Sequence, residues 1–181
     1  MSRYARPERE RRFLVAEPPA GLDPAGASLI EDRYLTGTRL RLRAMRPAAG
    51  GPPRYKLGQK LRTDPGDPTT VLLTNLYLSE PEYRLLATLP AATLTKTRHR
   101  LATASGPDLA VDVFGGPLAS LVLAEAELAD PDGLETFPAP ALALADVTAD
   151  DRFTGARLAS TSAPALRCLL AQFGLAPQRL H

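Results

Sequence analysis

The chain has 181 residues, of which 44% are hydrophobic, and this length and composition predict one domain with a packed core. Its 22 basic and 20 acidic residues nearly balance, which argues against a nucleic-acid-binding protein, where a larger basic excess is usual. A single cysteine excludes an internal disulfide. The lack of a long apolar run and of a secretory signal predicts a cytoplasmic protein that does not enter a membrane.

Strand-like segments dominate the chain, and few helices are expected. Alternating or apolar runs predict strands at Glu8–Val15, Leu29–Leu35, Thr38–Met45, Tyr55–Arg62, Thr69–Leu78, Leu94–Ala102, Leu109–Phe114 and Leu121–Ala129. Ser79 and Glu82 have the spacing of a capping box, which predicts a helix that ends near Leu89, before Pro90. Apolar residues at helical spacing predict a closing helix over Ala163–Gly174, with Cys168 buried on its apolar stripe.

Most of these strands have one apolar face and one strongly charged face. Side chains at alternate positions of a strand point the same way, so Glu8, Glu10 and Arg12 share a face. The same spacing gathers cations on three strands and carboxylates on two others, and the acidic strands lie near the beginning and end of the series. The other residues in this pattern are Arg39, Arg41, Arg43, Lys56, Lys60, Lys96, Arg98, Arg100, Asp112, Glu125 and Glu127.

Two architectures fit this alternation. In an open sheet the charged faces would meet water, whereas in a closed barrel they would line a polar interior. An eight-stranded barrel is wide enough to hold one small ligand. The arginines of Arg39–Arg43 would repel one another across a bare sheet. A polyanion among the cations and a divalent metal among the carboxylates would relieve this repulsion, which favours the barrel.

The motifs, in their order, resemble the CYTH superfamily, the triphosphate tunnel metalloenzymes. Glu8-x-Glu10-x-Arg12-Phe13-Leu14-Val15 is similar to the family's Glu-x-Glu-x-Lys strand, with Arg12 in place of the lysine. The resemblance covers about residues 6–160. Its other parts are Ile30–Leu35, Thr38–Arg41, Tyr55–Lys60, Thr95–Arg98, Val111–Phe114, Ala124–Leu128 and Val147–Leu158.

The resemblance implies an α+β, β-dominated fold, with an eight-stranded antiparallel closed barrel that forms a triphosphate tunnel with flanking helices. Residues 1–160 would form the CYTH-like tunnel domain, and residues 161–181 a C-terminal helix packed on the same domain. The implied activity is that of a phosphohydrolase, a triphosphatase, that uses Mg²⁺ or Mn²⁺ on inorganic triphosphate or an organic triphosphate. A triphosphate-containing molecule or polyphosphate is therefore the expected partner, without nucleic acid or membrane, and a homodimer stays open.

The resemblance also assigns roles to individual residues. Phosphate oxygens would be bound by Arg12, Arg39, Arg41, Lys60, Lys96 and Arg98. The expected metal ligands are Glu8, Glu10, Asp112, Glu125 and Glu127, and Glu8, Glu10 and Arg12 would be catalytic. Arg9, Arg11 and Arg33 are expected to face solvent or the outer layer, whereas Lys56, Arg43 and Arg100 would lie either in the tunnel or at its mouth. Neither His99 nor His181 is expected to bind metal.

One strand departs from the family. Family enzymes carry a Glu-x-Glu pair on the strand before the helix, and the matching positions are interpreted here as Leu72 and Thr74. Neither is a useful ligand for a hard divalent cation, which prefers carboxylate oxygens. Two alternatives to the triphosphatase therefore remain: an adenylate cyclase of the CYTH type, and a non-catalytic polyphosphate or nucleotide sensor.

Overall fold

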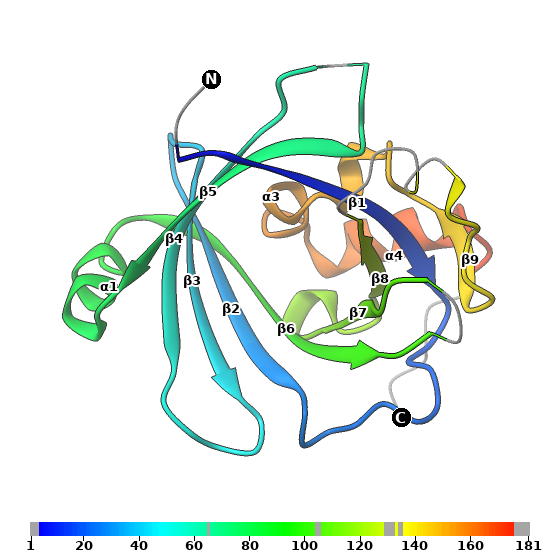
Figure 1. The fold of residues 1–181 in the computed structure, drawn as a ribbon, viewed down its shortest axis with the longest axis horizontal. Coiled ribbons are helices and arrows are strands. Elements are labelled where there is room, and N and C mark those ends of the chain that lie inside the picture. The colour runs from blue at the N-terminus through cyan, green and yellow to red at the C-terminus, as the bar shows by residue number, and fades with distance from the viewer. Residues whose placement is uncertain (1–3, 65, 104–105, 129–132, 134–135, 176–181) are drawn as a thin grey trace.

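The computed structural model describes residues 4–64, 66–103, 106–128, 133 and 136–175 (Figure 1). The strands of this part of the chain are β1 (Arg6–Val15), β2 (Ser28–Leu35), β3 (Leu40–Pro47), β4 (Arg54–Leu61), β5 (Thr70–Leu78), β6 (Ala91–Leu101), β7 (Leu109–Phe114), β8 (Val122–Glu127) and β9 (Ala143–Asp146). The helical segments are α1 (Glu80–Leu86), η1 (Gly116–Leu118), η2 (Asp151–Phe153), α3 (Gly155–Leu158) and α4 (Ala163–Ala171). None of the helices in these residues has the length and apolar character needed to cross a bilayer.

The first eight strands form a closed antiparallel barrel, which confirms the predicted fold class. The strand order is β5-β4-β3-β2-β6-β7-β8-β1, and β1 also pairs with β5, where Glu8 lies opposite Val71. The N-terminal half of β1 closes the barrel against β5. Further along, the same edge of β1 pairs with β9 at Phe13–Val15. One strand therefore joins the barrel to an extra outer strand.

One end of the barrel interior is apolar and covered by helices. Leu94, Phe114 and Leu123 continue the inward faces of β6, β7 and β8, and they pack with Phe153 and Leu158 in one core cluster. Helix α4 contributes Leu166, Leu169 and Leu170 to the same cluster. Figure 1 shows α3 and α4 on the β7–β8 side of the barrel. The polar part of the interior is therefore bounded on this side by packed side chains.

Helix α3 approaches the barrel closely at Gly155. A Cβ atom at this position would clash with the hydroxyl of Tyr34 on β2. Glycine is thus needed here for space alone, because no positive φ angle is involved. This contact places the start of α3 directly against the barrel rim.

The outer layers agree with most of the sequence predictions. Arg11 donates from Nε to Asp146 of β9 at 3.2 Å, and Arg33 donates to the carbonyl of Ala87 at 2.8 Å, so both lie outside the tunnel as expected. The capping box of α1 is present, with the backbone N–H of Ser79 donating to Glu82 at 2.7 Å. The helix itself ends at Leu86, earlier than predicted.

Some features were missed or wrongly predicted. The short elements β9, η2 and α3 were not predicted as a strand and helices, because each is too short to show a periodic pattern. Cys168 is exposed, so its predicted burial is wrong, whereas Leu166, Leu169 and Leu170 of the same helix are buried. Ala129 and His181 lie outside the described residues.

Candidate active site

A cavity of about 1060 Å³ lies inside the barrel. Side chains from all eight barrel strands line it. Its charged lining on the strands includes Glu8, Glu10, Arg12, Asp32, Arg41, Arg43, Lys60, Lys96, Arg98, Arg100, Glu125 and Glu127. The alternation of charged and apolar residues along the individual strands therefore does produce one polar interior, and both positive and negative side chains face it.

Strands β1, β4 and β8 bring the first group of charges together. Arg12 donates to Glu10 at 2.7 Å and to Glu125 at 3.3 Å. Lys60 pairs with Glu8 and, at 3.1 Å, with Glu10. The Glu-x-Glu-x-Arg motif is thus held by cations from its own strand and from β4. Each of these carboxylates is paired with a cation that could otherwise bind a phosphate oxygen.

Asp112 on β7 anchors the second group. It is fully buried, and Arg98 donates to it from Nε at 2.7 Å and from Nη2 at 2.6 Å, while Lys96 donates to it at 2.5 Å. Asp112 does not line the cavity, although both of its cations do. This position does not favour the predicted role of Asp112 as a metal ligand. It is the buried counter-ion that fixes Lys96 and Arg98 with their charged ends toward the cavity.

Asp32 on β2 is likewise a buried counter-ion, for the arginines of β3, and the sequence analysis missed it. Its carboxylate is 1% exposed and accepts two hydrogen bonds from Arg43, at 2.6 and 2.7 Å. Arg41 lies 3.6 Å from the same carboxylate, and its buried Nε has no hydrogen-bond partner within the described residues. The signal was available, since Ile30, Asp32 and Tyr34 alternate along the strand and share the inward face.

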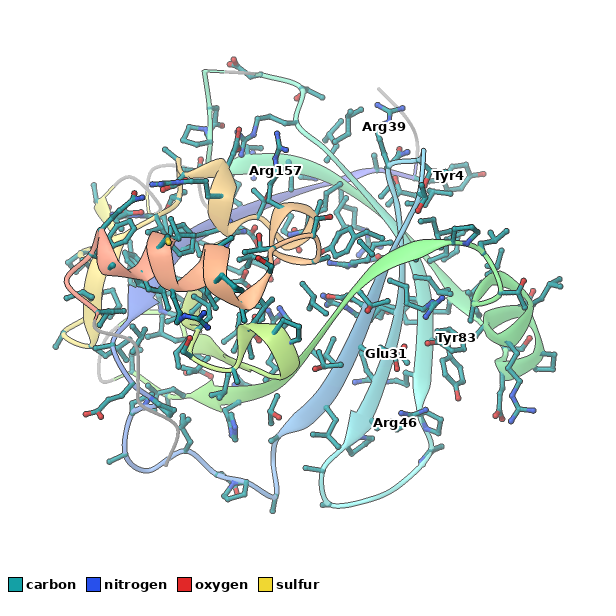
Figure 2. The ribbon with its side chains drawn as sticks, turned by 180° about the vertical axis from the view of Figure 1, so that it is seen from behind. Tyr4, Glu31, Arg39, Arg46, Tyr83 and Arg157 are labelled. Carbon is teal, nitrogen blue, oxygen red and sulfur yellow. The ribbon has the colours of Figure 1, made fainter. Side chains whose placement is uncertain are left out.

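The Arg-x-Arg-x-Arg segment runs from the opening of the cavity into the barrel, and this settles the position of Arg43, which the sequence left open between the tunnel and its mouth. Arg43 lies inside the barrel with its guanidinium on Asp32, whereas Arg39 precedes β3 and is exposed where the cavity opens. Figure 2 labels Arg39 at the edge of the barrel. Arg100 is also exposed and pairs with Asp108 at 2.5 Å. Lys56 does not line the cavity and instead lies 5.1 Å from the ring centre of Tyr77.

Burial and charge shift several pKa values in this cavity. Burial would raise the pKa of Glu125, but the charges of Arg98, Lys96 and Arg12 outweigh it and hold the pKa well below its usual range. Lys96 shows the opposite balance, since burial and the neighbouring Arg98 lower its pKa despite Asp112. Burial is therefore the main cost to the charged form of Lys96, and a bound polyanion would favour the ammonium.

Glu127 differs from Glu8, Glu10 and Glu125 in the cavity lining because it is exposed, and Lys60 and Arg98 only partly offset its charge. It has no ion pair or hydrogen bond to the part of the chain that the structure describes. Its pKa is raised by burial and by the negative charges of Glu8 and Glu10, and it lies opposite Glu10 in the β1–β8 pairing. Within the described residues, no three side chains of the His, Cys, Asp or Glu type already converge as a metal site. Glu8, Glu10 and Glu127 nevertheless supply the hard oxygen donors that suit a divalent cation.

The inward face of β5 was misassigned by one residue. Residues paired across two strands share a face, and Lys60 and Gly58, which face the cavity, pair with Leu73 and Asn75. Leu72 and Thr74 pair with Leu61 and Gln59 and therefore face outward. The departure from the family's Glu pair remains, but it lies at Leu73 and Asn75. The buried Oδ1 of Asn75 has no hydrogen-bond partner among the described residues.

Comparisons with known proteins agree with this architecture. The chain is similar to the solved structure of the inorganic triphosphatase NE1496, with 25% identity and a TM-score of 0.58 over 85% of this chain and 98% of that one. A second structure, of the hypothetical protein NE1496, gives 26% identity and a TM-score of 0.59 over 86% and 99% of the two chains. PH1819 from Pyrococcus horikoshii OT3, at 19% identity and a TM-score of 0.52 over 71% and 82%, shares the fold.

Neither the family models nor the curated proteins that were compared with the chain gave a match. The structural likeness covers nearly the whole of NE1496. Charged residues of the motifs named in the sequence analysis lie on the inward face of the barrel. The chain therefore shares the fold of NE1496, and this likeness is consistent with the resemblance of its motifs to the CYTH superfamily.

Proposed function

We propose that this protein is a metal-dependent phosphohydrolase that acts on inorganic triphosphate or on an organic triphosphate held inside the barrel. The observation that carries the proposal is the charged cavity, in which cations fixed by buried carboxylates face a second set of carboxylates across one space. The likeness to a protein named as an inorganic triphosphatase supports the same chemistry.

The cationic side of the cavity is suited to a chain of phosphates. The buried Nε of Arg41 has no hydrogen-bond partner among the described residues, while Lys96 and Arg98 are held in place from behind by Asp112. Arg12 and Lys60 contact carboxylates that a phosphate oxygen would replace. Phosphoryl transfer depends mainly on such positioning and on neutralising the charge of the transferred group. These side chains would bind and orient the phosphates before any bond is broken.

The acidic side of the cavity is suited to Mg²⁺ or Mn²⁺. Glu8, Glu10 and Glu127 would hold the ion, after the first two turn away from Lys60 and Arg12. A bound ion would supply Lewis-acid neutralisation of the phosphate oxygens. Glu125 lies between Arg12 and Arg98, which favours a role in positioning these two cations over a role as a metal ligand.

Phosphate release tests the proposed function directly. Purified protein is incubated with tripolyphosphate, ATP or thiamine triphosphate, each with Mg²⁺, Mn²⁺ or EDTA, and the products are separated and identified. We expect phosphate release from at least one of these compounds that requires the metal. Cyclic AMP as the product from ATP would instead indicate the cyclase, and binding without any turnover would indicate the sensor.

The sensor is the second candidate, and β5 is the feature that favours it. Leu73 and Asn75 occupy the inward positions of this strand, so no carboxylate from β5 completes the acidic side of the cavity. The cations that would bind a polyanion come from other strands and still line the cavity. A protein with this cavity could therefore bind a triphosphate and lack efficient turnover.

Placing carboxylates on the inward face of β5 distinguishes the phosphohydrolase from the sensor. It also tests whether Leu73 and Asn75, and not Leu72 and Thr74, face the cavity. The double variant Leu73→Glu/Asn75→Glu adds two oxygen ligands inside the cavity, and we expect phosphate release to rise about tenfold, ~1.4 kcal/mol of barrier, or the metal preference to change. The matched control is Leu72→Glu/Thr74→Glu, which adds the same charges on the outer face of the same strand. Equal effects of the two pairs on rate and metal preference would show that the strand faces have been misassigned.

A further inference from the structure

The cavity opens on one side beside two arginines that the barrel does not neutralise fully. Arg39 precedes β3, is exposed, and makes no ion pair or hydrogen bond with any residue that the structure describes. Arg62 follows β4, and its polar contacts within the described part of the chain are with the exposed Asp151, at 3.4 Å, and the carbonyl of Pro68, also at 3.4 Å. Both arginines line the cavity.

This opening differs from the one at the other end of the barrel. The start of β6 pairs with the end of β2, so its last residues lie at the end of the barrel away from Arg39. There the exposed Arg100 is paired with Asp108 at 2.5 Å. Among these three cavity-lining arginines, Arg100 is thus neutralised by a close carboxylate, whereas Arg39 and Arg62 are not.

The spacing of cations continues from this opening into the cavity. Arg39, Arg41 and Arg43 stand at alternate positions, which in an extended chain are about 7 Å apart along one face. Arg41 and Arg43 lie inside the barrel on Asp32, so Arg39 extends the same row outward. The cavity of about 1060 Å³ also lies at the upper end of the ~300–1,000 Å³ usual for small-ligand pockets, which leaves room beyond a triphosphate.

We propose that Arg39 and Arg62 form an outer anion subsite that binds the fourth phosphate of a linear polyphosphate. This proposal rests on the proposed function, since the first three phosphates occupy the inner cations. The subsite favours an inorganic chain over a nucleoside triphosphate, because a guanidinium forms strong charge-assisted hydrogen bonds with phosphate oxygens. The preferred ligand is then longer than tripolyphosphate.

Calorimetric titration in EDTA tests the subsite without turnover. The probes are tripolyphosphate, linear tetraphosphate and ATP, and the variants are Arg39→Ala and Arg62→Ala. The control is Arg46→Ala, an exposed arginine of β3 on the outer face of the barrel, labelled in Figure 2. We expect wild-type protein to bind tetraphosphate about tenfold more tightly than tripolyphosphate, a gain typical of one hydrogen-bonded charge pair.

In Arg39→Ala and in Arg62→Ala this preference should fall severalfold, while the affinities for tripolyphosphate and ATP change by less than about threefold. Added salt should reduce the preference in the wild type, because exposed charges are screened. Arg46→Ala should keep the full preference. Equal affinities for the two inorganic chains in wild type, or an unchanged preference in Arg39→Ala, would overturn the subsite. Failure of all three probes to bind would instead refute the proposed function.

Discussion

Replacing Glu10 by glutamine is expected to abolish metal-dependent phosphate release while leaving triphosphate binding intact or tighter. Glutamine keeps the length of the side chain and its oxygen can still accept the hydrogen bond from Arg12, now 2.7 Å long. It removes one of the three negative charges proposed to hold the divalent cation, and it also removes a carboxylate that repels a polyanion. The expected loss in kcat is about 10²–10³-fold, the size seen when one electrostatic group is lost from an active site.

A matched carboxylate outside the barrel provides the control for Glu10. Glu31 lies on the outer face of β2, 3.9 Å from Arg33, and Figure 2 shows it away from the cavity. Glu31→Gln should therefore keep full activity. The decisive comparison measures initial rates with Mg²⁺ and with Mn²⁺, and Kd by calorimetry in EDTA. Wild-type levels of phosphate release in Glu10→Gln would remove Glu10 from the proposed metal site.

Replacing Lys96 by methionine is expected to weaken triphosphate binding by about tenfold or more. Lys96 is largely buried at the cavity wall, where burial and Arg98 lower its pKa, so a phosphate next to it is poorly screened by water. A hydrogen bond to a charged group contributes roughly 1.5–3 kcal/mol. Methionine retains the length and can pack against Phe114, whose ring centre lies 5.4 Å from the ammonium, and Asp112 keeps both hydrogen bonds from Arg98.

The chain contains a natural control for this substitution. Lys56 lies outside the cavity lining, beside Tyr77, so Lys56→Met removes the same charge without touching the proposed site. The measurement is the rise in Tm on adding tripolyphosphate in EDTA, taken relative to each variant without ligand. Ligand at 100 times its Kd stabilises a protein by about 2.7 kcal/mol. A Tm rise that is the same in Lys96→Met, Lys56→Met and wild type would place the triphosphate elsewhere.

The alternation of charged and apolar residues along each strand showed which strands have a charged face. The predicted direction of the side chains was reliable where this alternation is strict. Glu8, Glu10 and Arg12 on β1 and Lys96 and Arg98 on β6 all line the cavity, as predicted. A strand has a period of two, so one well-marked face is enough to set the direction of every side chain. Most of the strands and the closing helix were predicted for the same reason, because each shows a regular period in its own residues.

Where the alternation is missing, the sequence could not decide. On β5 the run Val71–Leu73 is apolar at every position, so nothing local distinguishes its two faces, and a shift of one residue exchanges them. Only the pairing of Leu73 with Lys60 settles which face is inward. The position of Arg43, in the tunnel or at its mouth, stayed open for a related reason, since where a strand leaves the barrel depends on the neighbours that pair with it.

The composition and the periods of this sequence determined a β-rich domain, the charged faces of its strands and, through the order of the motifs, a resemblance to the CYTH superfamily. The tertiary structure decided which charges meet. Asp112 lies between two valines and Asp32 between Glu31 and Arg33, and only the folded barrel shows that these two aspartates fix Lys96, Arg98 and Arg43. Such pairs join residues on different strands, so their geometry depends on register and barrel closure, which no single segment of the chain contains.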